Sequence, residues 1–223
     1  SGAMEVHLLG MKKIMRYAVE TAERGLKLKP KGRWDVVSDI AFELDGWSDS
    51  EFGKDPSRKS VNEWSTTLNG APISTRSKMM PIIALSVTEA ELFAAVQCAQ
   101  DLMFIMRLLG TLGLRVKLPM KLTIDNKGAH DLCHNHSVGG RTRHIEVKQL
   151  FLREMKEHGL IDVVWKPGVI QRSDLFTKNL PRPAFERHAQ HFVGKDKYMA
   201  DAEGIKAHKQ GRVSDSTCSH GYG

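Results

Sequence analysis

The chain has 223 residues, a mass of 25.0 kDa and 41% hydrophobic residues, enough for one main globular domain with appendages. Its 33 Lys and Arg against 26 Asp and Glu give a net charge of +7, which is compatible with a polyanionic partner without requiring one. Three scattered cysteines, Cys98, Cys133 and Cys218, argue against a disulfide framework and favour a reducing intracellular setting, and no stretch reaches the length expected of a membrane span.

The N-terminal region is expected to be a helix followed by a linker. Residues 1–4 are typical of an expression scar. Within residues 5–35, apolar side chains recur at helical spacing from His7 to about Gly25, opposite a basic face, and predict an amphipathic helix. The charged, Pro- and Gly-containing stretch after it predicts a linker.

Residues 36–194 are expected to form the main domain, which begins with strands. Strand-like runs separated by turn residues are expected at Ala41–Asp49, Val61–Leu68 and Pro72–Ser77. The short loops between them predict an antiparallel meander.

Helices and strands alternate after the meander. The apolar run from Thr88 to Leu112 predicts a long helix, with Ser86 and Glu89 as a capping box. Alternation of this kind predicts an α/β fold with a mixed sheet and helices on its faces, and residues 195–223 are expected to be disordered. The further expected elements are a strand at Met120–Ile124, helices at Asn126–Cys133 and Ile145–Glu157, a strand at Leu160–Trp165, and helices at Ser173–Lys178 and Ala184–Phe192.

Four acidic residues occupy recognisable settings: Asp49 in WSDSE, Glu91 in TEAELFAA, Asp125 in LTIDNKG and Asp174 in RSDLFTK. Strand ends at one edge of a sheet can bring such side chains together. Clustered carboxylates repel one another unless divalent cations neutralise them, and the cations can then act on a phosphate. A single Asp at a strand end is more often a turn residue, so the metal-site prediction depends on the whole ordered set.

Several longer motifs occur in one order along the chain, and together they carry a resemblance. Between about Phe42 and Phe192 the chain resembles the ribonuclease H domain of copia-type (Pseudoviridae-like) LTR retrotransposon Pol polyproteins. The helix before it, HLLGMKKIMRYAVETAERGLKL, resembles the end of the reverse transcriptase region. The motifs are GWSDSEFGKDPSRKSVNEW, GAPISTRSKMMPIIALSVTEAELFAA, LTIDNKGAHDL, TRHIEVKQLFLREMKEHGLIDVVWKP and SDLFTKNLP.

The resemblance implies a ribonuclease H-like fold with a five-stranded mixed sheet, and an endoribonuclease that hydrolyses the RNA strand of RNA/DNA hybrids during reverse transcription. Asp49, Glu91, Asp125 and Asp174 would be catalytic and would hold two Mg²⁺ ions, replaceable by Mn²⁺, leaving 5′-phosphate and 3′-hydroxyl ends. Glu91 is preferred to Glu89 because the run ELFAAV matches the family's helix after its catalytic glutamate.

Residues beside these carboxylates are expected to contact the hybrid. Some would recognise the 2′-hydroxyl edge of the RNA and others would bind phosphates. The position of His144 before a helix fits capping or phosphate contact as well as a chemical role. The expected partners are the hybrid and the reverse transcriptase domain of the parent polyprotein, in a cytoplasmic virus-like particle or the nucleus, without a membrane. The groove candidates are Ser50, Ser86, Thr88, Asn126 and Lys127, and the phosphate candidates are Arg58, Lys59 and Lys78.

Other functions stay open. A catalytically weak ribonuclease H-like domain that binds hybrid or tethers a partner would share the fold, and the loop KPGVIQRSD lacks the histidine usual in cellular ribonucleases H. A DDE-type integrase would place its glutamate last, whereas Glu91 comes second. The cluster Cys133, His134 and His136 and the pair His188 and His191 do not form a complete zinc pattern, so their histidines are expected to lie at the surface.

Overall fold

The computed structural model describes residues 2–22, 24–25, 41–134, 143–168, 171, 175 and 180–193. They fall into two compact units, one of Lys27–Phe192 and one of the two ends of the chain, Ser1–Leu26 and Val193–Gly223. The linker and tail expected from the sequence lie outside the described residues, so the predicted domain boundaries stay predictions.

The terminal unit contains the helix α1, Gly2–Glu20. The predicted amphipathic helix is therefore present, and it begins and ends about five residues earlier than expected. The side chains of residues 4–20 are all exposed, including the apolar ones.

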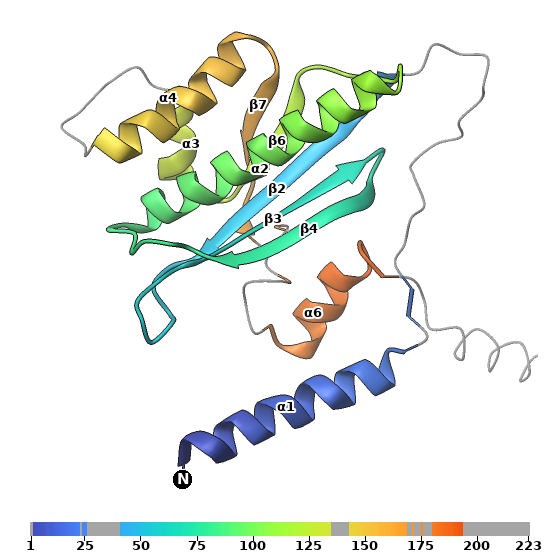
Figure 1. The fold of residues 1–223 in the computed structure, drawn as a ribbon, viewed down its shortest axis with the longest axis vertical. Helices are drawn as coiled ribbons and strands as arrows, with labels where there is room; N and C mark the ends of the chain where they lie inside the picture. The colour runs from blue at the N-terminus through green and yellow to red at the C-terminus, as the bar shows by residue number, and fades with distance from the viewer. Residues whose placement is uncertain are drawn as a thin grey trace, which may run out of the picture. The chain divides into compact units, whose positions relative to one another are not determined.

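The larger unit is built on a five-stranded sheet in the order β4-β3-β2-β6-β7 (Figure 1). The strands are β2 (Leu44–Glu51), β3 (Val61–Leu68), β4 (Ala71–Met79), β6 (Met120–Ile124) and β7 (Ile161–Trp165). The first three are antiparallel, whereas β6 runs parallel to β2 and β7 parallel to β6. The predicted mixed sheet with an antiparallel meander is confirmed.

The hairpin between β3 and β4 shows why the meander was predictable. Asn69 and Gly70 have φ values of 48° and 80°, which Asn and Gly adopt more easily than other residues and which a two-residue hairpin turn requires. By contrast, the expected strand Ala41–Asp49 is interrupted. A short strand β1 (Ala41–Phe42) leaves the main sheet and pairs in parallel with β5 (Arg115–Val116), a strand that the sequence did not predict.

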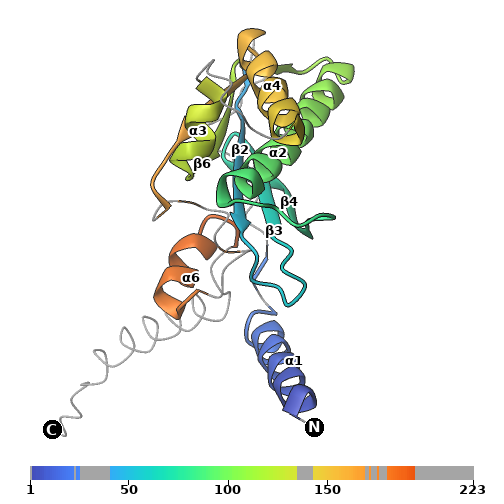
Figure 2. The same ribbon diagram turned by 90° about the vertical axis from the view of Figure 1, so that its left-hand side faces the viewer.

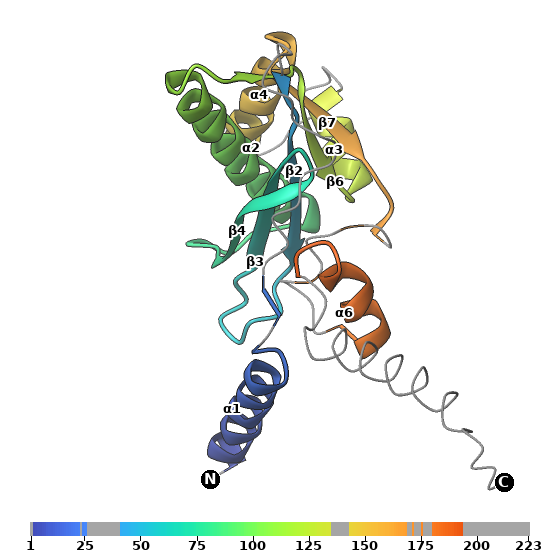
Figure 3. The same ribbon diagram turned by 90° about the vertical axis from the view of Figure 1, so that its right-hand side faces the viewer.

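Helices cover the sheet (Figures 1 and 2). The long helix α2 (Val87–Thr111) packs along β2 and β3, and α3 (Lys127–His134) and α4 (Arg143–Glu157) pack against it and against β7. The helix α6 (Arg182–Ala189), drawn in orange in Figure 3, follows later in the chain. Of the helix expected at Ser173–Lys178, only Leu175 is among the described residues, so that prediction is not tested.

Helix α2 contributes the centre of the core. Its side chains Leu92, Cys98 and Leu102 are fully buried against strand residues such as Leu122 and Ile124. The helix is long and apolar enough to cross a membrane by length and composition alone, so the sequence-based statement that no stretch reaches that length was wrong. One face of α2 is buried against the sheet, and its apolar composition is that of a core helix.

Candidate active site

Two of the predicted carboxylates come from neighbouring parallel strands. Asp49 lies on β2 and Asp125 directly follows β6. Trp47 of β2 is level with Thr123 of β6, so two residues further along each strand Asp49 and Asp125 reach the same edge of the sheet. Asp49 is 1% exposed, which places its carboxylate away from solvent.

The third carboxylate comes from the first turns of α2. Ser86 is the N-cap, its hydroxyl accepting the Glu89 N–H at 3.1 Å, while the Glu89 carboxylate accepts the Leu85 N–H at 2.8 Å. The Ser86 half of the predicted capping box is thus formed, whereas Glu89 bonds to the N–H of the residue before the N-cap and not to that of Ser86 itself, which still directs its carboxylate to the helix start. Glu91, 3% exposed, instead accepts the backbone N–H of Ser50 at 3.3 Å, next to Asp49.

Asp49, Glu91 and Asp125 therefore meet at one place. Each offers a carboxylate oxygen, and the three oxygens lie within 4.8 Å of one another. Three carboxylates so close repel one another when ionised, and oxygen donors of this kind suit Mg²⁺ or another hard divalent cation. The donor set consequently fits the metal implied by the sequence, and Asp174, the fourth predicted ligand, lies outside the described residues.

The described residues after β7, Lys166–Gly168 and Gln171, lie against this edge of the sheet. The indole N–H of Trp165 donates to the Asp125 carbonyl at 2.9 Å, and a Cβ built on Gly168 would lie 3.0 Å from Asp125 Oδ2. Gln171, 1% exposed, donates from Nε2 to the Ser48 carbonyl at 2.6 Å. The Lys166 ammonium lies 5.0 Å from the centroid of the Trp47 ring. Only the three-dimensional contacts reveal the roles of Gly168 and Gln171, because in the sequence both belong to an ordinary polar loop.

The predicted nucleic-acid contacts occupy varied positions. Ser50 is 6% exposed and its hydroxyl donates to Asn62 Oδ1 at 2.9 Å, so it supports the site from inside rather than facing a groove. Asn126 Oδ1 accepts the Ala129 N–H at 2.9 Å and caps α3, beside Thr88, whose hydroxyl lies 3.2 Å from a Cβ built on Gly128.

The remaining candidates are basic. Lys78 is exposed on β4, Lys127 is exposed at the start of α3, and Arg58 and Lys59 lie in the loop between β2 and β3. Arg58 has a φ of 61°. His144 lies in α4, and its side chain is outside the described part of the structure.

The structure corrects one prediction about the histidines and shows two of the cysteines to be free and buried. His188 is 5% exposed, so the expectation that it is a surface group was wrong; it belongs to the buried side of α6 together with Ala189. Cys98 and Cys133 are free and buried, and burial raises the pKa of the Cys133 thiol to about 12. Within the described residues, the carboxylate trio is the one metal-compatible cluster.

Comparisons with known proteins find relatives among the Pol polyproteins of plant transposons. It is 33% identical over 186 residues, 83% of its length, to the retrovirus-related Pol polyprotein from transposon RE1 of Arabidopsis thaliana. It is 34% identical over 144 residues, 64% of its length, to that from transposon TNT 1-94 of Nicotiana tabacum. The chain spans only 12% and 11% of the length of these relatives.

Among solved structures, the N-terminal RNase H domain of a Mycobacterium tuberculosis protein, solved as a fusion with maltose-binding protein, is similar with a TM-score of 0.46. That match has 10% identity and covers 67% of this chain and 98% of the other. No family model matches the chain. The chain is homologous to one segment of the retrovirus-related Pol polyproteins of plant copia-type transposons, and it has an α/β fold built on a five-stranded mixed sheet.

Proposed function

We propose that this chain is a Mg²⁺-dependent endoribonuclease that hydrolyses the RNA strand of RNA/DNA hybrids. The observation that carries the proposal is the convergence of Asp49, Glu91 and Asp125, whose carboxylate oxygens lie within 4.8 Å of one another. Its natural setting would be reverse transcription inside an intracellular particle, with the reverse transcriptase region of the same polyprotein as neighbour. The homology to Pol polyproteins supports that setting.

The three carboxylates would hold the cation, with Asp174 as a further ligand in a two-metal site. When bound, Mg²⁺ would polarise the scissile phosphate and lower the pKa of the attacking water. The products would be a 5′-phosphate and a 3′-hydroxyl.

The surrounding residues would keep the carboxylates in place. The Ser50 N–H orients Glu91, the Trp165 indole holds the backbone of Asp125, and Gly168 lets the loop after β7 come close to the Asp125 carboxylate. Gln171 fixes the same loop to Ser48, the residue before Asp49. Such fixed supports matter because catalytic geometry is sensitive to small displacements.

The selection of RNA would depend on the 2′-hydroxyls in the minor groove. The side chains of Thr88 and Asn126 both border Gly128 of α3, each 3.2 Å from a Cβ built there, and Ser86 is the N-cap of α2. Their hydroxyl and amide groups are suited to hydrogen bonds with the RNA edge.

The test is cleavage of a hybrid whose RNA strand is labelled, in Mg²⁺, beside duplex DNA and duplex RNA of the same sequence. We expect cleavage of the RNA in the hybrid alone, loss of activity in Asp125→Asn, and normal activity in the matched control Asp162→Asn. Asp162 lies on β7 level with Lys121, towards the opposite end of the sheet. Tight hybrid binding without cleavage in Mg²⁺ or Mn²⁺ would instead establish a tether domain.

A further inference from the structure

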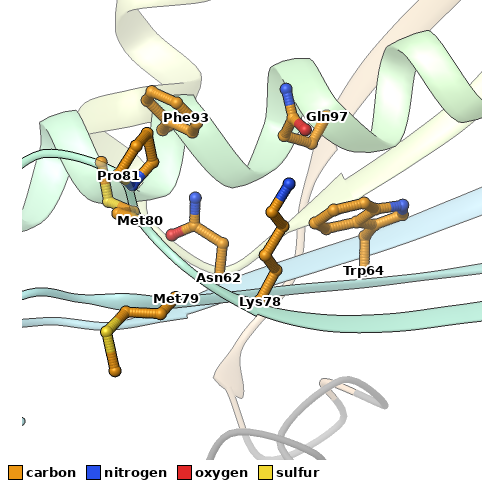
Figure 4. A pocket seen from close by; sticks show the side chains of 8 residues that line it. All are labelled: Asn62, Trp64, Lys78, Met79, Met80, Pro81, Phe93 and Gln97. Atoms are coloured by element: carbon orange, nitrogen blue, oxygen red, sulfur yellow. The ribbon is translucent and has the colours of Figure 1, made fainter.

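A pocket separate from the carboxylate trio opens between the sheet and helix α2, with a volume of about 220 Å³ (Figure 4). We call it the Phe93 pocket. Its floor is formed by Asn62 and Trp64 of β3 and Lys78 of β4, and Phe93 and Gln97 of α2 face them. The space is suited to one ring-sized group and is too small for a base pair.

The lining combines aromatic surface, amides and a cation. Asn62 uses its Oδ1 to accept the Ser50 hydroxyl, which leaves its amide N–H groups for the pocket, and Gln97 uses its Nε2 to donate to Gln100 at 3.1 Å, which leaves its carbonyl oxygen. Figure 4 shows the ammonium group of Lys78 and the amide of Asn62 pointing toward α2. The pocket consequently offers hydrogen-bond donors, an acceptor and apolar ring surface.

The charge of the lining favours an anion. Among the described residues, no carboxylate lines the pocket and no ion pair involves Lys78. The nearby Asp101 carboxylate accepts the Trp64 indole N–H at 2.9 Å. A second cation contacts one of the lining side chains, because the Lys148 ammonium of α4 lies 4.5 Å from the centroid of the Phe93 ring. Partial burial lowers the pKa of Lys148, and Glu89 opposes that shift.

The pocket adjoins the carboxylate trio. The hydroxyl of Ser50 bonds to Asn62 in the pocket floor, while the backbone N–H of Ser50 bonds to Glu91. Ser50 therefore links the floor of the Phe93 pocket to the carboxylate trio, which is the basis for expecting one nucleic-acid ligand to contact both.

We propose that the Phe93 pocket holds one unpaired nucleotide of the nucleic-acid ligand, such as a nucleotide in a single-stranded extension of the hybrid. The base stacks on Phe93 and contacts the edge of Trp64, Asn62 and Gln97 bond to its polar edge, and Lys78 contacts the adjoining phosphate. Stacking on aromatic rings is tolerant of base identity, so the pocket selects unpaired structure rather than sequence. This proposal depends on the proposed function in one respect, which is that the ligand is an RNA/DNA hybrid.

The test compares two fluorescent ligands by anisotropy in EDTA, so that nothing is cleaved. One is a blunt RNA/DNA hybrid, and the other is the same hybrid with a three-nucleotide single-stranded DNA extension. We expect the extension to tighten binding to the wild-type chain about tenfold, equivalent to about 1.4 kcal/mol. Phe93→Leu, which keeps an apolar contact with Met80 and Ala90, should remove most of that gain without changing affinity for the blunt hybrid.

Further variants separate charge, folding and catalysis. Lys78→Gln should remove part of the gain and reduce the salt slope for the extended ligand by about 0.7. Lys121 is an exposed lysine of β6 outside the pocket, so Lys121→Gln is the matched control. It should change neither the affinity gain nor the salt slope. Asp125→Asn should keep the full gain, so failure of cleavage in Mg²⁺ would not affect this result. Circular dichroism and thermal melting would verify that each variant is folded.

A 4-thiothymidine in the extension locates the contact directly, and we expect it to crosslink to the peptides that contain Trp64 or Phe93. The proposal would be overturned by equal wild-type affinity for the two ligands, by an undiminished gain in folded Phe93→Leu, or by crosslinks confined to other segments. Displacement of the extended hybrid by free 5′-AMP at comparable concentration would overturn the strand assignment and indicate a mononucleotide site.

Discussion

The two ends of the five-stranded sheet both carry charged residues, in opposite arrangements. At one end Asp49 and Glu91 are buried and lie with Asp125 within 4.8 Å, so like charges are held together. Near the other end, the Lys117 ammonium lies 3.7 Å from the Glu43 carboxylate, and both side chains are more than half exposed. Solvent and an opposite charge stabilise the second arrangement, whereas the first is stabilised by a bound cation. A candidate metal site therefore differs from ordinary surface charge in two ways: its carboxylates are buried, and their charged neighbours have the same sign.

The largest effect should come from removing a carboxylate of the buried end. Asp49→Asn should lower hybrid cleavage by at least about 100-fold, because cation-mediated stabilisation of the transition state contributes several kcal/mol. It should also reduce the rise in melting temperature caused by Mg²⁺, since a ligand at 100 times its Kd stabilises the folded state by about 2.7 kcal/mol. Melting curves with and without Mg²⁺ measure this independently of activity. An unchanged Mg²⁺ effect would contradict the metal assignment.

A smaller effect should follow from crowding the same end without changing its charge. In Gly168→Ala the new methyl group would begin 3.0 Å from Asp125 Oδ2, so the loop or the carboxylate must shift. We expect cleavage to fall about tenfold, because misplacement by a fraction of an ångström already weakens catalysis. Steady-state kinetics on the hybrid measure the loss. The control is Gly110→Ala, where a Cβ meets no atom within 4 Å, and equal activity of the two variants would contradict the role of Gly168.

The support of Glu91 by its helix start can be tested through stability. Ser86→Ala removes the hydroxyl that accepts the Glu89 N–H and should lower the free energy of unfolding by about 1 kcal/mol. Urea unfolding measures the change, and Ser86→Asp should restore most of the stability because Asp is also a good N-cap. No loss in Ser86→Ala, or no recovery in Ser86→Asp, would show that the cap contributes little to the position of α2.

Much of the fold could be predicted because local patterns and tertiary packing agree. The alternation and turn residues gave β3 and β6 with their observed bounds, and the capping box located the start of α2 to within one residue. The two-residue strand β5 was missed because so short a run has no periodicity. The interruption after Phe42 is set by the pairing of β1 with β5, which is likewise a tertiary effect.

The candidate site was predictable in its carboxylates and not in its supports. The preference for Glu91 over Glu89 came from the resemblance, and the structure places Glu91 with Asp49 and Asp125 and turns Glu89 to the backbone of Leu85. The contacts of Gly168, Gln171 and the Phe93 pocket join residues far apart in the chain. The Gln171 to Ser48 bond, for example, spans 123 positions. Such contacts leave no local pattern in the sequence.

The smallest effect should come from the exposed end. Glu43→Gln removes one partner of an ion pair whose side chains are 57% and 66% exposed. The Glu43 backbone N–H bonds to Asn69 Oδ1 at 2.8 Å, and this bond does not depend on the side chain, so the strand entry keeps its anchor. We expect the free energy of unfolding to change by less than about 0.5 kcal/mol in urea titrations, with cleavage unchanged. Solvent already stabilises both charges, so their attraction adds little. A loss above about 1 kcal/mol, or any loss of Mg²⁺-dependent cleavage, would mean that the charge arrangements at the two ends of the sheet are energetically linked.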